Sequence, residues 1–292
     1  MSIRDDYRAY LERQRSFNAM PMSGYFRQQE KRYIHPFRIF GNLYYVGETW
    51  VCIHLIDTGD GLLLIDSGNY NTSGMLVHAI WEAGFNPSSV KWIILPHGHI
   101  DHIGNAEFFR NMFGSRLYLS EPDAKMFADD PALAYLHDNP NVTEALFEPD
   151  VIIHDGDVLS FGTTRIEFFL VPGHTAGCIA CFFDVSDGQD TKRAGYYGGF
   201  GFNTLGKSYL RDIGDTSYEM RRRYLSSLEK VIDQPVDIFL GNHAANNNII
   251  EKRNYELEHP GSNPYLDPKE WRSYLDGKKR ELLAFMADPA NN

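Results

Sequence analysis

The chain has 292 residues, 43% of them hydrophobic, so it can bury a large core as one big domain or as two ordinary ones. Acidic residues outnumber basic ones by 39 to 28, and the net charge of −11 argues against a nucleic-acid partner. The charged N-terminus has no apolar stretch of signal-peptide length, and no run approaches the roughly 18 apolar residues of a membrane helix. We therefore expect a soluble, cytoplasmic protein with no membrane partner.

The first half of the chain alternates between strand and helix patterns. Residues 1–36 are polar and partly helical, and we expect an N-terminal arm there, followed by one domain at 37–292. Short β-branched and aromatic runs between glycine-containing turns predict an antiparallel meander. In the segments after it, the spacing of apolar residues alternates between that of a helix and that of a strand. The predicted elements are strands at 37–47, 50–58 and 61–68, a helix at 72–84, a strand at 90–95, a helix at 106–114, a strand at 115–120 and a short helix at 121–128.

The second half repeats this order. A polar loop at 137–145 precedes it. The predicted elements are strands at 150–162, 164–173 and 178–185, a helix at 217–232, a strand at 236–243 and two further helical stretches. Strands followed by helices occur twice, which predicts two sheet-and-helix halves packed as one four-layer unit.

Two local patterns favour a structural interpretation. Cys178 and Cys181 form a C-x-x-C, but the surrounding residues are typical of a strand, where positions three apart point to opposite faces. We therefore expect buried thiols there, and likewise at Cys52. The basic run at residues 221–223 lies in a predicted helix, where three consecutive side chains spread around the axis, and we interpret it as a solvated face.

The sequence "PHGHIDHIGN" at 96–105 is the densest group of metal-binding residue types. His97 and His99 are two positions apart after an apolar strand, so in an extended segment their rings point the same way. Asp101 repeats that offset, and His102 follows as the chain turns toward the next helix. Four strong donors at one strand end predict a metal site.

One segment cannot close a metal site, and two other histidines follow the same pattern. His174 in "LVPGHTAG" and His243 in "FLGNHAAN" each come at the end of an apolar strand. The remaining histidines lie within a strand, on a helix or in polar contexts, and we expect structural roles for them.

These motifs resemble the metallo-β-lactamase superfamily, whose pattern is H-x-H-x-D-H, then a His in a "PGHT" context, then a final His. "GLLLIDSG", "VPGHTAGC" and "NPYLDPKEWRSYL" are similar to the third subclass of class B β-lactamases. The resemblance implies an α/β fold, a four-layer αββα sandwich, and two Zn²⁺ ions per chain. It implies one ion held by His97, His99 and His174, and the other held by Asp101, His102 and His243.

The sequence departs from the superfamily pattern after the third strand of the second half. Many hydrolases of the superfamily carry a metal-bridging Asp there, and the third subclass offers hydroxyl groups for the substrate carboxylate. This chain has "RAGYYGGFGFN", with Gly198 and Gly199 at that point. The candidate substrate contacts are Tyr196, Tyr197, Gly199, Phe200 and Asn246, with Phe202, Asn247 and backbone N–H groups of the loop also considered. The aromatic rings either form an apolar cleft wall or pack the sheet edge.

The predicted function is hydrolysis of a small-molecule substrate. A bound zinc ion lowers the pKa of water from about 15.7 to roughly 7. We expect a hydroxide shared by two metals to attack a carbonyl carbon of a β-lactam-like cyclic amide, with Asp101 as the catalytic residue that orients it. The alternatives are a single-iron oxygenase of the same fold and a hydrolase of lactones or thioesters. A nuclease and a non-catalytic scaffold are weaker alternatives.

Overall fold

The structure is a computed structural model that describes residues 28–135 and 146–291. It also describes isolated positions before residue 28, namely Arg4, Arg8, Leu11, Glu12, Arg15, Ser16 and Ala19. The predicted loop at 137–145 and most of the predicted N-terminal arm lie outside these residues. The division into an arm and one domain therefore stays a prediction.

The first sheet has seven strands in the order of the chain. They are β1 (Phe37–Phe40), β2 (Leu43–Tyr45), β3 (His54–Asp57), β4 (Leu62–Ile65), β5 (Val90–Ile94), β6 (Arg116–Ser120) and β7 (Val151–Ile153). The pairings from β1 to β4 are antiparallel, which confirms the predicted meander. The pairings from β4 to β7 are parallel, because helical connections bring the chain back to the end of the sheet at which the previous strand began.

The second sheet has five strands in the order β12-β11-β10-β9-β8. They are β8 (Val158–Phe161), β9 (Thr164–Leu170), β10 (Ile179–Ser186), β11 (Thr191–Tyr197) and β12 (Ile238–Gly241). The strands from β8 to β11 are antiparallel, and β12 joins β11 in parallel after a long helical connection. The glycine-rich segment that we considered as a loop thus begins as strand β11.

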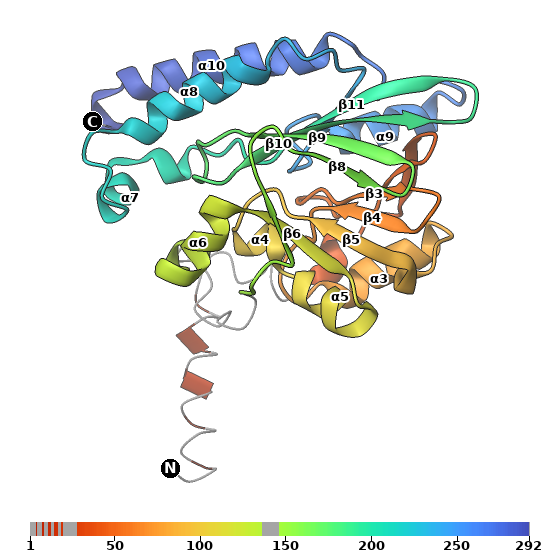
Figure 1. The fold of residues 1–292 in the computed structure, drawn as a ribbon, viewed down its shortest axis with the longest axis horizontal. Coiled ribbons are helices and arrows are strands. Elements are labelled where there is room, and N and C mark those ends of the chain that lie inside the picture. The colour runs from red at the N-terminus through yellow and green to blue at the C-terminus, as the bar shows by residue number, and fades with distance from the viewer. Residues whose placement is uncertain are drawn as a thin grey trace.

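Helices cover the outer face of each sheet (Figure 1). In the first half these are α3 (Ser73–Glu82), α4 (Ile100–Ile103), α5 (Ala106–Phe113) and α6 (Glu121–Asp129). In the second half α8 (Glu219–Val231) and α10 (Glu270–Ala287) cover the sheet, α7 (Lys207–Asp212) precedes them, and α9 (Ile249–Glu258) packs through Ile249 on the cluster between the two sheets. Single 3₁₀ turns occur at Gln29–Arg32, Pro87–Ser89, Pro131–Tyr135, Asn203–Leu205 and Pro289–Asn291. None of the helices in the described parts of the chain is both long and apolar enough to cross a bilayer.

Three apolar clusters separate the layers. The central cluster contains Leu63 of the first sheet and Phe168 of the second, so it lies between the two sheets. A second cluster joins the first sheet to α3 and α5, and a third joins the second sheet to α8 and α10. Three cores between four layers define the predicted αββα sandwich.

Two expectations about buried side chains have different outcomes. Cys178 and Cys181 are free and buried in different clusters on the two faces of the second sheet, which confirms the structural interpretation. Arg221 is not on a solvated face, because only 1% of its surface is exposed and its Nε donates to the carbonyl of Leu205. The prediction holds only for Arg222 and Arg223, which are exposed.

The central core gives a stability prediction. Replacing Phe168 by Ala removes a fully buried ring between the sheets, and we expect a loss of about 3–5 kcal/mol in the free energy of unfolding. Leu257 is 61% exposed, so Leu257→Ala should change it by less than about 0.5 kcal/mol. Urea unfolding of the two variants, followed by circular dichroism, measures both values. Equal effects would contradict the assignment of Phe168 to the core.

Candidate metal centre

The six predicted metal-binding residues meet at one edge of the sandwich. His97 and His99 follow β5, and Asp101 and His102 lie in the short helix α4 that comes next. The other two residues, His174 and His243, follow β9 and β12 of the second sheet. The site is therefore built from both sheets, and neither half of the chain could form it alone.

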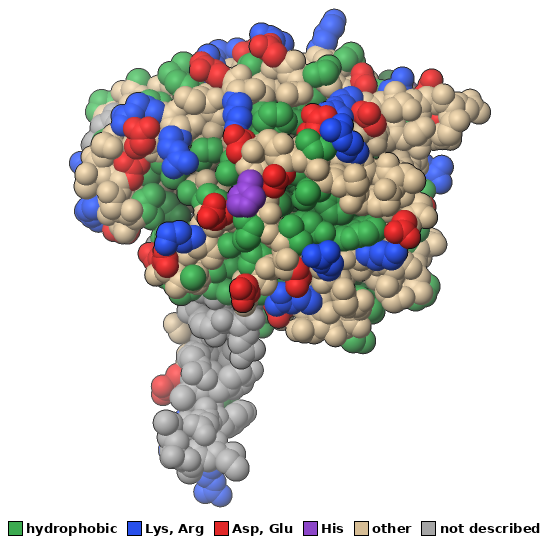
Figure 2. Space-filling model, in the orientation of Figure 1, with side chains coloured by type: hydrophobic (Ala, Val, Ile, Leu, Met, Phe, Trp, Pro, Cys, Tyr) green, Lys and Arg blue, Asp and Glu red, His purple; other side chains and the backbone are tan. Residues whose placement is uncertain are grey.

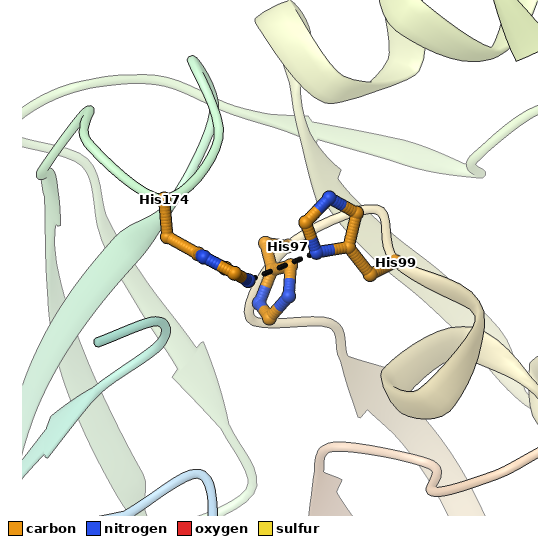
Figure 3. A group of neighbouring side chains, drawn as sticks. All are labelled: His97, His99 and His174. Atoms are coloured by element: carbon orange, nitrogen blue, oxygen red, sulfur yellow. Dashed lines mark hydrogen bonds between the residues drawn. The ribbon is translucent and has the colours of Figure 1, made fainter. Parts of the chain in front are cut away.

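Three imidazoles form the first group of donors. The ligand atoms of His97, His99 and His174 all lie within 4.8 Å of one another. His99 Nδ1 lies 3.0 Å from His174 Nε2, and Figure 3 shows these two nitrogen atoms pointing toward each other beside His97. Three buried nitrogen atoms at this spacing suit one tetrahedral ion with an open fourth position.

The second group adjoins the first through His97. His97, Asp101 and His102 also place their ligand atoms within 4.8 Å of one another. His243 Nε2 lies 3.3 Å from His102 Nε2 and 3.7 Å from Asp101 Oδ2. The fold thus brings together all six residues that the sequence predicted.

Backbone carbonyl groups fix the orientation of three of these rings. His97 Nδ1 donates to the Gly198 carbonyl (2.6 Å), and His174 Nδ1 donates to the Gly201 carbonyl (3.0 Å). His243 Nδ1 lies 3.3 Å from the Trp50 carbonyl oxygen. Each contact leaves Nε2 as the atom that faces the centre, which is the usual arrangement behind a metal-binding histidine.

Close packing explains why the loop after β11 carries glycines. A Cβ atom on Gly198 would lie 2.7 Å from the Ile179 carbonyl oxygen, and one on Gly199 would lie 2.8 Å from Cys178 Sγ. Gly199 would also crowd the ring of His174, at 2.9 Å. A bridging acid or a hydroxyl side chain therefore has no space at these two positions.

A buried carboxylate outside the predicted set orients His102. Asp66 Oδ2 lies 2.5 Å from His102 Nδ1, and both side chains are fully buried. Burial acts to lower the pKa of His102, but the carboxylates of Asp101 and Asp66 outweigh it and raise this pKa to about 9. Tyr196 Oη also lies 3.4 Å from Asp66 Oδ2. The two carboxylates favour a His102 ring that is protonated on both nitrogens. A metal ion bound at His102 Nε2 would take the place of the proton on that atom.

Unpaired buried atoms show that the residues fit a metal ion. Among the described residues, His97 Nε2 and Asp101 Oδ1 are buried and have no hydrogen-bond partner, and His99 turns its Nδ1 toward His174 Nε2 at the centre. Burial, followed by the neighbouring histidines, lowers the pKa of His97 well below its usual value, so this ring is neutral at pH 7. Neutral imidazoles beside a carboxylate are ligands for a divalent ion such as Zn²⁺. Such an ion would satisfy atoms that otherwise remain desolvated.

Asp123 of α6 ties the two histidine loops together. Its Oδ2 accepts from the Gly98 N–H (2.8 Å) and the Thr175 hydroxyl (2.8 Å), and its Oδ1 accepts from the Gly177 N–H (2.9 Å). Gly98 lies between the first two histidines, and Thr175 follows His174. One buried side chain thus fixes the distance between the β5 loop and the β9 loop.

The structure corrects the expectation about the aromatic substrate contacts. Tyr196 and Tyr197 lie on β11 and are fully buried, one in the central core and one in the outer core of the second sheet. Phe200 is 5% exposed and stacks on Tyr197. These rings pack the sheet, as the alternative interpretation held, and do not line a cleft. Gly199 is buried, and Asn246 is partly exposed and donates to Asn242 Oδ1.

Sequence reasoning missed three residues around the centre. Asp66 directly follows strand β4 in "LLLIDSG", and its positive φ of 78° marks a sharp turn that the strand pattern did not reveal. Asp123 is hidden in a polar stretch of a short helix. Trp50 stacks on His243 with ring centroids 5.5 Å apart, and only the tertiary fold brings them together. Of these three residues, only Asp66 had a signal in the sequence, because it is an acid directly after an apolar strand.

Comparison with known proteins agrees with this geometry. Residues 52–187 match the metallo-β-lactamase superfamily. The metallo-β-lactamase FEZ-1 of Legionella gormanii is similar in structure, with a TM-score of 0.75 and 26% identity over 87% of this chain and 96% of that one. BJP-1 of Bradyrhizobium japonicum, a subclass B3 enzyme, gives a TM-score of 0.75 and 24% identity over 88% and 95%.

Curated relatives cover less of the chain. An uncharacterized protein of Mycobacterium leprae is 31% identical over 47% of this chain and 62% of its own length. The hydroxyacylglutathione hydrolase GloC of Haemophilus influenzae is 31% identical over 44% and 58%. The chain thus matches less than two thirds of the length of either relative. The matched segment, the fold and the donor set together make this chain similar to the metallo-β-lactamase superfamily.

The cross-link at Asp123 gives a second prediction. In Asp123→Asn an amide NH₂ would face groups that are all donors, and we expect a loss of about 1–3 kcal/mol in stability. We also expect a fall in zinc affinity of about ten- to a hundred-fold, because the two loops lose their fixed spacing. Asp129→Asn, an exposed change on the same helix, is the matched control. Urea unfolding and competition titration with a zinc chelator measure both effects, and wild-type zinc affinity in Asp123→Asn would contradict the role.

Proposed function

We propose that the protein is a dinuclear zinc hydrolase that opens a cyclic amide of the β-lactam type. His97, His99 and His174 would hold one ion, and Asp101, His102 and His243 would hold the other. Zinc at such a site activates water as a nucleophile near neutral pH and polarises a carbonyl group. The observation that carries the proposal is that two groups of possible metal ligands share His97, and that His97 Nε2 and Asp101 Oδ1 are buried without a hydrogen-bond partner among the described residues.

Asp101 has the position of a residue that orients the attacking water. Its Oδ2 faces His102 and His243, at 3.5 and 3.7 Å, while its Oδ1 is buried and has no partner among the described residues. Burial acts to raise the pKa of Asp101, but the surrounding histidines lower it below its usual value. The Asp101 carboxylate is therefore ionised, and it can accept a hydrogen bond from a water molecule and so orient it.

The substrate class follows from what surrounds the centre. The glycine at position 198 leaves no room for a bridging acid, and the fold is similar to subclass B3 enzymes along most of the chain. Both observations favour a cyclic amide. The similarity to GloC favours a second candidate, thioester hydrolysis, over the matched part of the chain.

The metal content tests the two-ion proposal. Purified protein should contain about two zinc ions per chain, and Asp101→Asn should retain about one while staying folded. Asp60→Asn, an exposed change at a surface ion pair, should keep both ions. Elemental analysis with circular dichroism measures this. About one iron and no zinc would instead favour the oxygenase alternative.

A substrate screen of the zinc-loaded protein tests the reaction. Gly198 and Gly199 offer no side-chain anchor for a substrate carboxylate, so one charge-assisted hydrogen bond of roughly 1.5–3 kcal/mol is missing at these two positions. We expect detectable β-lactam hydrolysis, slower by about ten- to a hundred-fold than with such an anchor, and complete loss with a chelator. Efficient lactone or thioester turnover without β-lactam cleavage would refute the cyclic-amide assignment.

A further inference from the structure

A pocket opens beside the metal centre, next to His174. It has a volume of about 380 Å³ and is lined by the β9–β10 loop, including His174, together with α6, the α7 segment and the start of α8. The surface is hollowed between α7 and α6 (Figure 2). Met126 of its wall also packs against Gly98, between the first two histidines, because a Cβ on Gly98 would lie 2.7 Å from Met126 Cε. The pocket is thus continuous with both histidine loops.

The wall of this pocket is mainly apolar. Met126, Leu133, Ile213 and Met220 supply the apolar surface. A volume of this size fits the non-reacting part of a small substrate, and an apolar wall favours a hydrocarbon group there. The pocket therefore has the size and lining of a subsite next to the reacting bond.

Arg223 is the charged group on the wall that remains free. Asp215 accepts from the N–H groups of Glu219 and Met220 at the start of α8, and Glu219 pairs with Arg222. Arg223 is exposed, lines the pocket, and has no ion pair or hydrogen bond within the described residues. Its guanidinium group is thus available to a ligand, and its planar donors match a carboxylate.

Tyr209 adds a neutral donor closer to the histidine loops. Its side chain is partly buried and lines the pocket, and its hydroxyl has no hydrogen-bond partner in the described parts of the chain. Burial, with smaller effects of Asp123 and Asp130, raises the pKa of Tyr209 to about 12. The hydroxyl therefore stays protonated at pH 7 and can donate to a carbonyl oxygen.

We propose that this pocket is the subsite for the non-reacting part of the substrate, and that it selects an apolar group bearing a carboxylate, which Arg223 binds. The proposal rests on the proposed function in one respect, because it places the reacting bond at the metal centre. It names a carboxylate-binding residue in a chain that has Gly198 and Gly199 beside the metal centre, where no side chain can serve as the anchor. Arg223 is then a specificity-determining residue.

Binding of a matched pair of probes tests the subsite without requiring turnover. We would titrate 4-phenylbutyrate and its uncharged amide, 4-phenylbutyramide, into the zinc-loaded protein by isothermal calorimetry. The wild-type protein should bind the acid about ten-fold or more tightly than the amide. Arg223→Gln should remove this preference, while Arg222→Gln, the neighbouring exposed arginine that pairs with Glu219, should keep it.

A pocket-filling variant locates the site. Ile213→Trp should weaken binding of both probes by about ten-fold or more, with unchanged zinc content and circular dichroism. A preference for the acid that persists in Arg223→Gln would mean that the metal ions hold the carboxylate, and it would overturn the proposal. Equal binding of both probes to the wild type would overturn it as well. Absence of β-lactam hydrolysis would refute the cyclic-amide assignment but would leave these binding results intact.

Discussion

Five imidazoles and a carboxylate occupy one buried space, and this crowding is the constraint on which the rest of the molecule depends. The buried ring nitrogens have lost their contact with water, and two of them, His97 Nε2 and His99 Nε2, have no hydrogen-bond partner among the described residues. Unpaired buried polar atoms cost about 1–3 kcal/mol each in the absence of a ligand. The surrounding layers must therefore hold the donors in place and supply stability from elsewhere, chiefly from the three apolar cores.

The structure holds the donors mainly through main-chain groups and two acids. Carbonyl oxygens of Gly198 and Gly201 orient histidines from other loops, and Asp123 joins the β5 and β9 loops. Main-chain groups move only with the fold itself, so this arrangement couples the metal centre to the packing of the two sheets. The glycine loop is thus a support for the histidines, and close contact with them excludes larger side chains there.

This support has a consequence for substrate recognition. Gly198 and Gly199 have no room for side chains, so these two positions cannot supply a polar anchor and we expect recognition to come from neighbouring elements. The segment from α7 to α8 borders His174 and carries both apolar and polar side chains. Specificity in this protein is therefore expected from helical elements of the second half, which differ more easily in sequence than the strand ends.

The sequence by itself determined the sandwich and the six donors. Strand patterns ending in His97, His174 and His243 were sufficient, because apolar periodicity and strong ligand types are local signals. The motif resemblance then supplied the proposed division of these donors between two ions.

Only the tertiary structure decided what lies behind and beside the donors. The aromatic segment before Gly198 could have been a loop or a strand, and pairing with β10 and β12 placed Tyr196 and Tyr197 in opposite cores. Arg221 is buried and Arg223 exposed because the helix rotates successive residues by about 100° against the packed sheet. Asp123 and Trp50 act on histidines that are distant in the chain. Such contacts leave no periodic trace in the sequence, because they depend on how separate elements meet in space.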